Sequence, residues 1–293
     1  MTATIMDGKA LAAEIEAKLV EDASRLKELG HEPSLATILV GDDQPSRVYL
    51  ASKHKAAKRV GISSTSHVLP ADSTEEELAS LIEQLNRDES VDGILLQLPL
   101  PSHLNERRMV GVITPDKDVD GLTSTNTGRL FYGESDLIPC TPRGVMALLH
   151  HYGIRTASAT AVIINRSTMV GKPLYHLLLN QDATVTMCHS RSSELDTVTS
   201  RADIVITAVG RRPTFVLTAD MVKDGAVVID VAINRIAGKI LGDADFDQVA
   251  RKASFITPVP GGVGPMTVVM LMQNTLIAAS MQRGLTLSPV VQC

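Results

Sequence analysis

The chain has 293 residues, of which 44% are hydrophobic and 21% are charged, values typical of a folded globular protein rather than a disordered or fibrous one. Its 28 Lys and Arg against 33 Asp and Glu give a net charge of −5, so it lacks the basic character of a nucleic-acid or membrane binder. With 3% aromatic residues and no Trp, it also has few side chains that could stack on single-stranded bases. We therefore expect neither nucleic acid nor a membrane as a partner.

Cysteine usage and the start of the chain indicate the compartment. The chain has three cysteines, Cys140, Cys188 and Cys293, which are widely spaced and form no CxxC pair. This spacing argues against a disulfide framework and against a thiolate metal site. Charged residues interrupt the first 19 residues, so they contain no signal-peptide apolar segment. A long uncharged stretch ends at Arg283, but its prolines and two amide side chains favour a buried core helix over a membrane span. We expect a cytoplasmic protein without a metal.

Helical and strand patterns alternate along the first half of the chain. The first predicted helix has apolar residues from Leu11 to Leu26 and Gly30 as its stop, and the second covers about residues 46–61. The third opens at Ser73 with a capping box of Ser73 and Glu76 and continues through Leu85. Between them lie two apolar runs that predict buried strands, LATILV (35–40) and GILLQL (93–98). Apolar strands separated by helices are typical of a parallel sheet covered by helices.

The pattern restarts after the polar stretch 116–133. Thr141 and Pro142 predict the start of a helix, and apolar runs predict strands at residues 161–164, 183–188, 203–209, 226–231 and 254–257. A final apolar helix covers residues 266–281. The fold class is therefore α/β with two domains divided near residue 140, and the last helix can pack on either domain.

The second domain places a turn, NRSTMVGKP (165–173), directly after its first strand, with a helix predicted from about Met169 or Val170. In a doubly wound sheet this turn and the helix start bind a pyrophosphate. The usual GxGxxG fingerprint is absent, and the chain's GxG, Gly262 to Gly264, lies elsewhere. An ordinary turn is the alternative.

The end of the next strand carries His189, Ser190 and Arg191, where an Asp or Glu would favour NAD. A hydroxyl and a guanidinium suit a 2′-phosphate, and Arg166 in the first turn can reach the same group. These residues favour NADP over NAD, although each one alone is also typical of a solvated loop.

Tyr49 and Lys53 lie four residues apart, on one face of a predicted helix. Tyr can stack on a flat substrate, and Lys can act as a base if its pKa is lowered. Gln97 interrupts an apolar strand and would orient the amine without raising its pKa as a Glu would. The alternative for Tyr49 and Lys53 is that they lie on a solvated helix face. The alternative for Gln97 is that its amide forms its hydrogen bonds with backbone groups.

Two further segments attract attention. PDKDVDGLT (115–123) resembles the start of an EF-hand loop, but Thr127 replaces its final Glu, so we reject a calcium site. One of its carboxylates can instead bind the N–C–NH₂ edge of a heterocycle. PVPGGVGPMT (258–267) combines rigid prolines with permissive glycines and predicts a loop that a ligand approaches closely.

Together these motifs resemble one family, the bifunctional methylenetetrahydrofolate dehydrogenase/cyclohydrolases. The segments that match, in the family's order and over nearly the whole chain, are YLASKHKAAKRVGI, DGILLQLPLP, PDKDVDGL, PCTPRG, RSTMVGKP, ATVTMCHS, ADIVITAVG and TPVPGGVGPMT. The resemblance implies a folate-binding catalytic domain of residues 1–139 and 271–293, completed by the C-terminal helix. It implies a Rossmann-like NADP-binding domain of residues 140–270, and a cytosolic homodimer.

The resemblance also implies roles for individual residues. Lys53 would be the catalytic amine, tuned by Gln97, with Tyr49 stacking on the folate. Asp120 would bind the pterin edge, and Pro260, Gly261 and Gly262 would line the folate crevice. The residues assigned to NADP are Asn165, Arg166, Ser167, Ser190, Arg191 and Ile233.

The implied activity is NADP-dependent oxidation of 5,10-methylenetetrahydrofolate followed by hydrolysis of the methenyl form to 10-formyltetrahydrofolate. The chain departs from the family at Asn165 and Ala232, where Gly is usual. Because both departures fall in the dehydrogenase half, alternatives remain: a cyclohydrolase with weakened dehydrogenase activity, or a non-catalytic NADP-binding sensor. A short-chain dehydrogenase is disfavoured, because that class places its glycine turn before the YxxxK pair.

Overall fold

The computed structural model describes residues 2–287, and these form two compact units. The three-stranded unit contains Glu14–Cys140 and residues 268–287, and the six-stranded unit contains residues 2–13 and Thr141–Thr267. The predicted fold class, two α/β domains with the last helix returning to the first, is confirmed. Residues 2–13, however, join the six-stranded unit, because β1 (Thr4–Ile5) pairs with that sheet.

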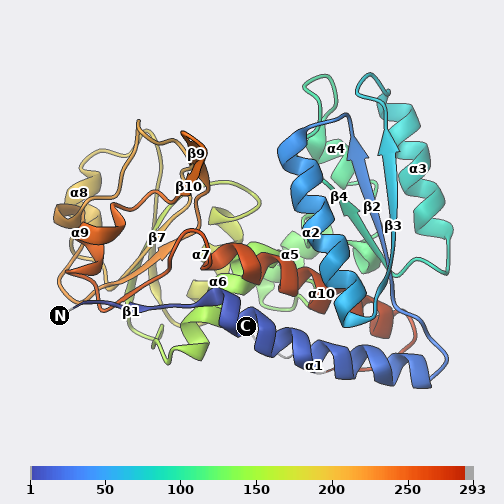
Figure 1. The fold of residues 1–293 in the computed structure, drawn as a ribbon, viewed down its shortest axis with the longest axis horizontal. Helices are drawn as coiled ribbons and strands as arrows, with labels where there is room; N and C mark the ends of the chain where they lie inside the picture. Colours follow the sequence, from blue (N-terminus) through green and yellow to red (C-terminus); the bar gives the residue numbers. More distant parts are fainter. Residues whose placement is uncertain (1, 288–293) are drawn as a thin grey trace. The chain divides into compact units, whose positions relative to one another are not determined.

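The three-stranded unit is built on a parallel sheet of order β3-β2-β4, with β2 at Ser34–Val40, β3 at Ser63–Leu69 and β4 at Gly93–Leu96. Helices α2 (Gln44–Val60) and α3 (Glu75–Arg87) connect these strands and lie alongside them (Figure 1). After β4 come the short elements α4 (Glu106–Val110), η1 (Pro115–Lys117) and α5 (Ser124–Tyr132). The C-terminal ends of β2 and β4 therefore meet at one edge, where residues that follow them can converge.

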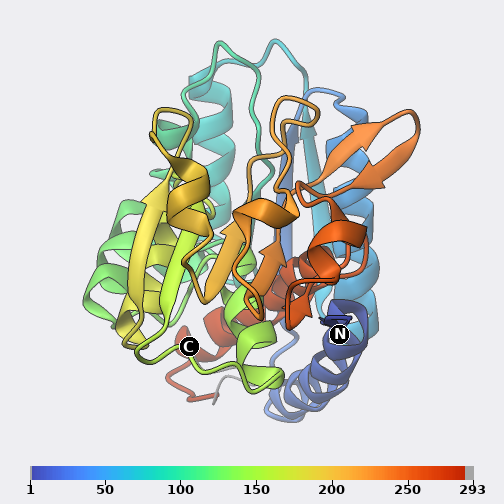
Figure 2. The same cartoon turned by 90° about the vertical axis from the view of Figure 1, so that its left-hand side faces the viewer.

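The six-stranded unit is doubly wound, with all strands parallel in the order β1-β11-β8-β7-β5-β6. The bounds not yet given are β5 (Thr160–Ile164), β6 (Thr184–Cys188), β7 (Ile204–Thr207), β8 (Val227–Asp230) and β11 (Phe255–Ile256). The connecting helices are α6 (Cys140–His151), α7 (Gly171–Asn180), α8 (Leu195–Thr199), η2 (Ala219–Met221) and α9 (Phe246–Ala250). A hairpin of β9 (Asn234–Ile236) and β10 (Lys239–Leu241) forms a separate small sheet (Figure 2).

The strand order fixes where a ligand can bind in this sheet. Strand β5 lies between β6 and β7, so the chain leaves it in one direction to reach β6 and resumes on its other side at β7. In doubly wound sheets, ligands bind at such a switch point, beyond the C-terminal ends of the strands. The segment that the sequence singled out, 165–173, follows β5 directly and runs into α7.

Two long helices contribute residues to both units, α1 (Gly8–Glu28) and α10 (Val263–Met281). Helix α10 is long and apolar enough to cross a membrane by length and composition, with a mean hydropathy of 1.3. However, 78% of its apolar window is buried within the described structure, as in the core helix of a soluble protein. The prediction of a buried core helix is confirmed.

Some local features differ from the sequence predictions. The capping box uses Thr74 and Glu77, each one residue later than predicted: Thr74 Oγ1 accepts from the Glu77 N–H, and the Glu77 carboxylate accepts from the Thr74 N–H. Strand β3, SSTSHVL, was not predicted, because it lies at the sheet edge and alternates without a clear apolar face. Cys140 and Cys188 are buried free thiols, and Cys293 lies outside the described residues.

Candidate active site

Lys53 is the centre of the candidate site in the three-stranded unit. It projects from α2 and is only 5% exposed, and its Nζ donates a hydrogen bond of 3.0 Å to Oε1 of Gln97. Gln97 comes directly after β4, and its backbone N–H continues the ladder to the Ile38 carbonyl of β2. The two residues that the sequence paired are therefore in direct contact, one from helix α2 and the other from the end of β4.

Burial lowers the pKa of Lys53 below its ordinary value, because desolvation penalises the ammonium. Asp120 opposes this effect by raising the pKa, and Cys140 does so to a smaller extent, so both lie near the amine. Gln97 is neutral and adds no charge. The site thus favours an amine that gives up its proton more easily than a solvated lysine does.

Tyr49 lies one helical turn before Lys53, with the lysine Nζ 4.5 Å from the centre of its ring. Its ring is partly exposed, whereas the amine beside it is buried. A flat aromatic ligand can therefore stack on the ring while remaining within reach of the amine. The face shared by positions 49 and 53 is thus partly buried rather than a solvated helix face.

Two carboxylates in the loop after β4, Asp118 and Asp120, have different surroundings. Asp118 is 1% exposed, and its oxygens accept from the N–H groups of Leu122 and Thr123 and from Asn126 Nδ2. Asp118 therefore builds the loop. Asp120 is partly exposed, and within residues 2–287 its carboxylate accepts no hydrogen bond, so it can receive donors from a ligand.

In the six-stranded unit, the side chain of Asn165 is folded into the turn after β5. Its Oδ1 accepts from the N–H groups of Ser167 (2.7 Å) and Gly171 (3.1 Å), and its Nδ2 donates to the carbonyl of Ala208 at 2.7 Å. Ala208 follows β7, so one amide connects the two segments that flank the switch point. Asn165 does not adopt a left-handed backbone, and its side chain holds the turn in shape instead of filling the crevice.

This turn resembles the missing glycine fingerprint in one respect. A Cβ at Gly171 would collide with the carbonyl oxygen of Asn165, so a glycine is required where α7 begins. Ser167 Oγ accepts from the Val170 N–H at 3.1 Å and completes the turn. The turn is thus shaped by one glycine and two polar side chains, and its contact with a phosphate stays a prediction.

The remaining candidate cofactor residues lie at the C-terminal edge of the same sheet. Ser190 and Arg191 are exposed and follow β6, and Arg166 is exposed in the turn after β5. Ile233 follows β8 and is 54% exposed, an apolar side chain presented to solvent. These positions fit a dinucleotide with a 2′-phosphate, since strands β5 and β6 are neighbours and an exposed isoleucine can pack against a flat ring.

Ala232, the second departure from the family pattern, is buried at 6% exposure, and its N–H donates to Asp230 Oδ1 at 3.1 Å. It lies outside the left-handed region, so its methyl group causes no backbone strain. Neither departure therefore disturbs the edge of the sheet where the cofactor residues gather.

The loop with Pro260, Gly261 and Gly262 packs within the six-stranded unit. Gly261 has φ of +109°, and its carbonyl accepts from the Lys9 N–H at 3.0 Å, while the Gly262 N–H donates to the Pro258 carbonyl at 2.8 Å. A Cβ at Gly8 would collide with the Gly262 carbonyl. Tight turning and the close approach of α1 thus account for these glycines, and contact with folate stays a prediction.

Sequence reasoning missed a pair of buried carboxylates at the edge of the six-stranded sheet, Asp230 and Asp243. Asp243 is 0% exposed and accepts from Thr207 Oγ1, Asn234 Nδ2 and the N–H groups of Val209 and Gly210. Asp230 ends β8 and accepts from the N–H groups of Ala232 and Ala244. The available signal was a charged residue ending the apolar run AVVID.

Known proteins match the chain along most of its length. Residues 6–120 match the catalytic domain, and residues 139–283 the NAD(P)-binding domain, of tetrahydrofolate dehydrogenase/cyclohydrolase. The bifunctional protein FolD of Cenarchaeum symbiosum is 52% identical over 280 residues, covering 96% of this chain and 99% of that protein.

Two solved structures are also similar. The bifunctional enzyme FolD of Campylobacter jejuni, a methylenetetrahydrofolate dehydrogenase/cyclohydrolase, is 48% identical with a TM-score of 0.93, covering 96% of this chain and 99% of that one. The Trypanosoma brucei enzyme, solved with NADP cofactor and inhibitor, is 36% identical with a TM-score of 0.91, covering 97% and 99%. The chain therefore belongs to the tetrahydrofolate dehydrogenase/cyclohydrolase family.

Proposed function

We propose that this chain oxidises 5,10-methylenetetrahydrofolate with NADP and then hydrolyses the methenyl product to 10-formyltetrahydrofolate, with Lys53 as the catalytic amine. The observation that carries the proposal is the 3.0 Å hydrogen bond between buried Lys53 and neutral Gln97. It places an amine with a lowered pKa beside an aromatic ring and a carboxylate that is available to a ligand. That combination suits a flat, nitrogen-rich substrate whose reaction moves protons.

The substrate is held by Tyr49 and Asp120 in this proposal. Tyr49 stacks on the p-aminobenzoyl ring, and Asp120 accepts two hydrogen bonds from the N–C–NH₂ edge of the pterin. A carboxylate has two acceptor oxygens in a plane, so it matches two parallel N–H donors. Orientation is the main contribution that the chain makes to hydride transfer.

In the oxidation step, NADP supplies the hydride acceptor when it is bound. The chain's contribution is to bind and orient it. Asn165 and Ser167 shape the turn that receives the pyrophosphate, and Arg166, Ser190 and Arg191 hold the 2′-phosphate. Ile233, which is 54% exposed, would pack against the nicotinamide.

In the hydrolysis step, water adds to the cationic methenyl carbon, and the neutral Lys53 amine takes one of its protons. The resulting ammonium is held by Gln97 Oε1 and the Tyr49 ring. It then returns that proton to the ring nitrogen as the carbon–nitrogen bond breaks. The second water proton is released to solvent, which balances the loss of the substrate's positive charge.

The direct test is a spectrophotometric assay of the purified chain with methylenetetrahydrofolate and either NADP or NAD. The proposal expects nicotinamide reduction with NADP well above that with NAD, and loss of the methenyl absorbance as 10-formyltetrahydrofolate forms. Methenyl hydrolysis without nicotinamide reduction would support the alternative of a cyclohydrolase with weakened dehydrogenase activity. Cofactor binding without either reaction would support the sensor.

We propose further that the chain is a cytoplasmic homodimer. The family resemblance supports the dimer, and the two buried free thiols, Cys140 and Cys188, are compatible with a reducing compartment. Light scattering on the purified protein tests the dimer, and cell fractionation tests the compartment.

A further inference from the structure

Helix α10 carries a buried amide that the proposed mechanism does not use. Asn274 is 0% exposed, and its Nδ2 donates two hydrogen bonds of 2.8 Å, one to the Val119 carbonyl and one to the Ile138 carbonyl. The same nitrogen lies 3.6 Å from Cys140 Sγ. One side chain thus connects two loop segments that are 19 positions apart in the sequence.

These two segments carry groups that act on the substrate and on Lys53. Val119 precedes Asp120, and Ile138 lies two residues before Cys140, the two groups that oppose the lowered pKa of Lys53. The segments also touch directly: Cys140 Sγ donates to the Val119 carbonyl at 3.4 Å. Gly121 has φ of +67°, and a Cβ there would lie 2.7 Å from the Leu137 carbonyl oxygen. The loop with Asp120 is therefore in close contact with residues 137–140, and Asn274 forms hydrogen bonds with both segments.

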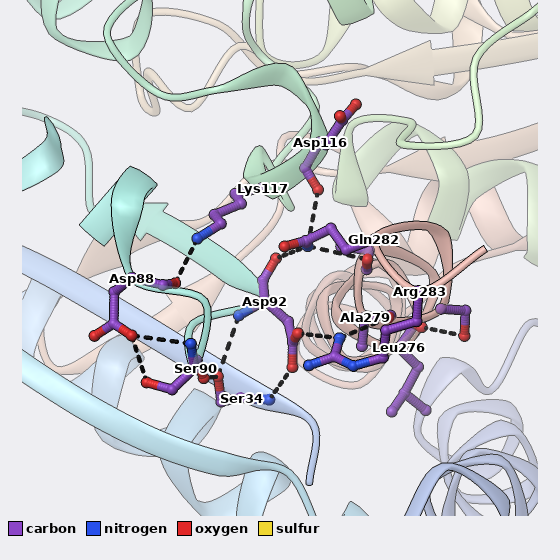
Figure 3. A network of polar contacts seen from close by, with 12 residues as sticks. Ser34, Asp88, Ser90, Asp92, Asp116, Lys117, Leu276, Ala279, Gln282 and Arg283 are labelled. Atoms are coloured by element: carbon purple, nitrogen blue, oxygen red, sulfur yellow. Dashed lines mark hydrogen bonds and ion pairs between the residues drawn. The ribbon is translucent and has the colours of Figure 1, made fainter. Parts of the chain in front are cut away.

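Helix α10 is itself fixed to the sheet beyond Asn274. Arg283 Nη1 bonds the fully buried carboxylate of Asp92, and Gln282 Nε2 donates to the Asp92 carbonyl at 2.8 Å (Figure 3). Asp92 Oδ2 also accepts from the Ser34 N–H of β2 at 2.8 Å. Asp92 directly precedes β4, which leads to Gln97. These hydrogen bonds therefore connect the C-terminal end of α10 to the start of β4.

We propose that Asn274 is a positioning residue, which sets the place of Asp120 for folate binding by joining the loop of Val119 to the segment of Ile138. The role rests on the proposed function, because Asp120 is taken to bind the pterin. Because the backbone next to Asp120 is fixed by Asn274, the Asp120 carboxylate has little freedom to move away from the pterin edge. Less conformational entropy of this loop is then lost when the substrate binds. Asn274 touches no substrate and acts through Asp120.

The test compares Asn274→Ala with Thr275→Val. Thr275 is also 0% exposed, and within residues 2–287 its Oγ1 donates only to the Leu271 carbonyl of its own helix. It therefore reports the effect of losing a buried polar group that does not connect the two loop segments. We expect Asn274→Ala to raise KM for methylenetetrahydrofolate about tenfold, with KM for NADP unchanged. Thr275→Val should leave both KM values unchanged. A purely structural role would lower the amount of active enzyme and the apparent kcat, without this split.

A double-mutant cycle with Asp120→Ala decides whether the effect passes through Asp120. In that background, Asn274→Ala should raise KM for the folate far less than it does alone. Equal factors in both backgrounds, or an unchanged KM in the single variant, would overturn the inference. Should Asn274→Ala fold poorly, Asn274→Ser keeps a side-chain donor and should give a smaller rise in KM.

Hydrogen exchange on the same variants gives a second readout that needs no activity. Asn274→Ala should speed exchange in residues 117–123 and 137–140, and Thr275→Val should not. Unchanged exchange in these segments would contradict the connection. The two hypotheses remain separable, because absence of wild-type turnover would reject the proposed function while exchange still decides whether Asn274 holds the loop.

Discussion

Lys53 Nζ donates to Gln97 Oε1 at 3.0 Å, and Nε2 of the same Gln97 amide donates to the Leu98 carbonyl at 2.7 Å. A carbonyl oxygen can only accept, so the NH₂ of Gln97 must face Leu98 and its oxygen must face the lysine. The backbone thereby fixes which end of the amide the amine meets. The amine is oriented by a neutral acceptor, which does not stabilise the ammonium as a carboxylate would.

Replacing the amine tests its catalytic role. Lys53→Met keeps a long apolar side chain in the buried position but removes the proton-carrying group. We expect the cyclohydrolase kcat to fall by about 10² to 10⁴, and the dehydrogenase kcat, followed as NADPH absorbance, to fall by a smaller factor. Lys55→Met, at an exposed position of the same helix, is the control and should leave both rates unchanged. Full cyclohydrolase turnover in Lys53→Met would refute the assignment.

Converting the neutral acceptor into a carboxylate tests the electrostatic role of Gln97. In Gln97→Glu, a negative charge at hydrogen-bond distance favours the ammonium and raises the pKa of Lys53. Because the neutral amine is the proton acceptor, the rising limb of the cyclohydrolase pH profile should move to higher pH by about one to two units. The control, Gln84→Glu, adds the same charge at an exposed position of α3. A limb that stays in place would show that another group titrates in the profile.

Most strands were predictable from their apolar runs, including the edge strands β4 and β6, but the edge strands β3 and β1 were not. The strands β2, β5, β7 and β8 read as continuous apolar runs because helices or loops cover both faces of the sheet. The edge strands β3 and β1 have too few apolar residues to be distinguished from loops, and β1 is paired only through a partner about 250 positions away.

The candidate site shows the same division. Lys53 and Gln97 could be paired from sequence because an amide in an apolar run needs a hydrogen-bond partner. Lys53 lies on a predicted helix and Gln97 lies in a predicted strand of the same domain. The part played by Asn165 could not, since its bond to Ala208 depends on two strands becoming neighbours. The same holds for Asp243, whose donors come from several elements.

Cofactor preference depends on the guanidinium after β6. Arg191→Ser removes a charged donor from the proposed 2′-phosphate site, so KM for NADP should rise about tenfold or more while KM for NAD stays the same. Initial rates with each cofactor measure both values. Arg201→Ser, an exposed arginine of the same unit, is the matched control. A parallel rise for both cofactors would mean that Arg191 does not read the 2′-phosphate.

Restoring the family's usual glycine at position 165 should harm this chain. In Asn165→Gly, the N–H groups of Ser167 and Gly171 and the carbonyl of Ala208 all lose their partner. We expect a loss of about 1–3 kcal/mol in stability and a higher KM for NADP. Thr168→Gly adds a glycine at an exposed position of the same turn and separates flexibility from lost bonds. Thermal melting and dehydrogenase kinetics provide the measurements; a more stable and more active Asn165→Gly would contradict the role of this amide.

Asp230 gives the chain a pH-dependent stability of a particular sign. Burial raises the pKa of Asp230 from 3.8 to about 6, against the lowering effect of the Ala244 N–H, while nearby Asp243 adds to the rise. Between these two pH values the folded state binds more protons than the unfolded state, so the free energy of unfolding falls as pH rises through this window. Above pH 6 the protein carries the full cost of a buried carboxylate.

Asp230→Asn removes the titrating group and with it this slope. The unfolding free energy of the wild type minus that of Asp230→Asn should be greater at pH 5 than at pH 8 by about 1.4 kcal/mol. Denaturant unfolding at the two pH values measures this difference. Thr257→Val is the control, because its Oγ1 accepts from the Asp230 N–H at 2.7 Å but does not titrate, so its effect should be the same at both pH values. If the wild type and Asp230→Asn lose stability in parallel from pH 5 to pH 8, Asp230 ionises with its ordinary pKa and its burial is compensated by the two N–H donors.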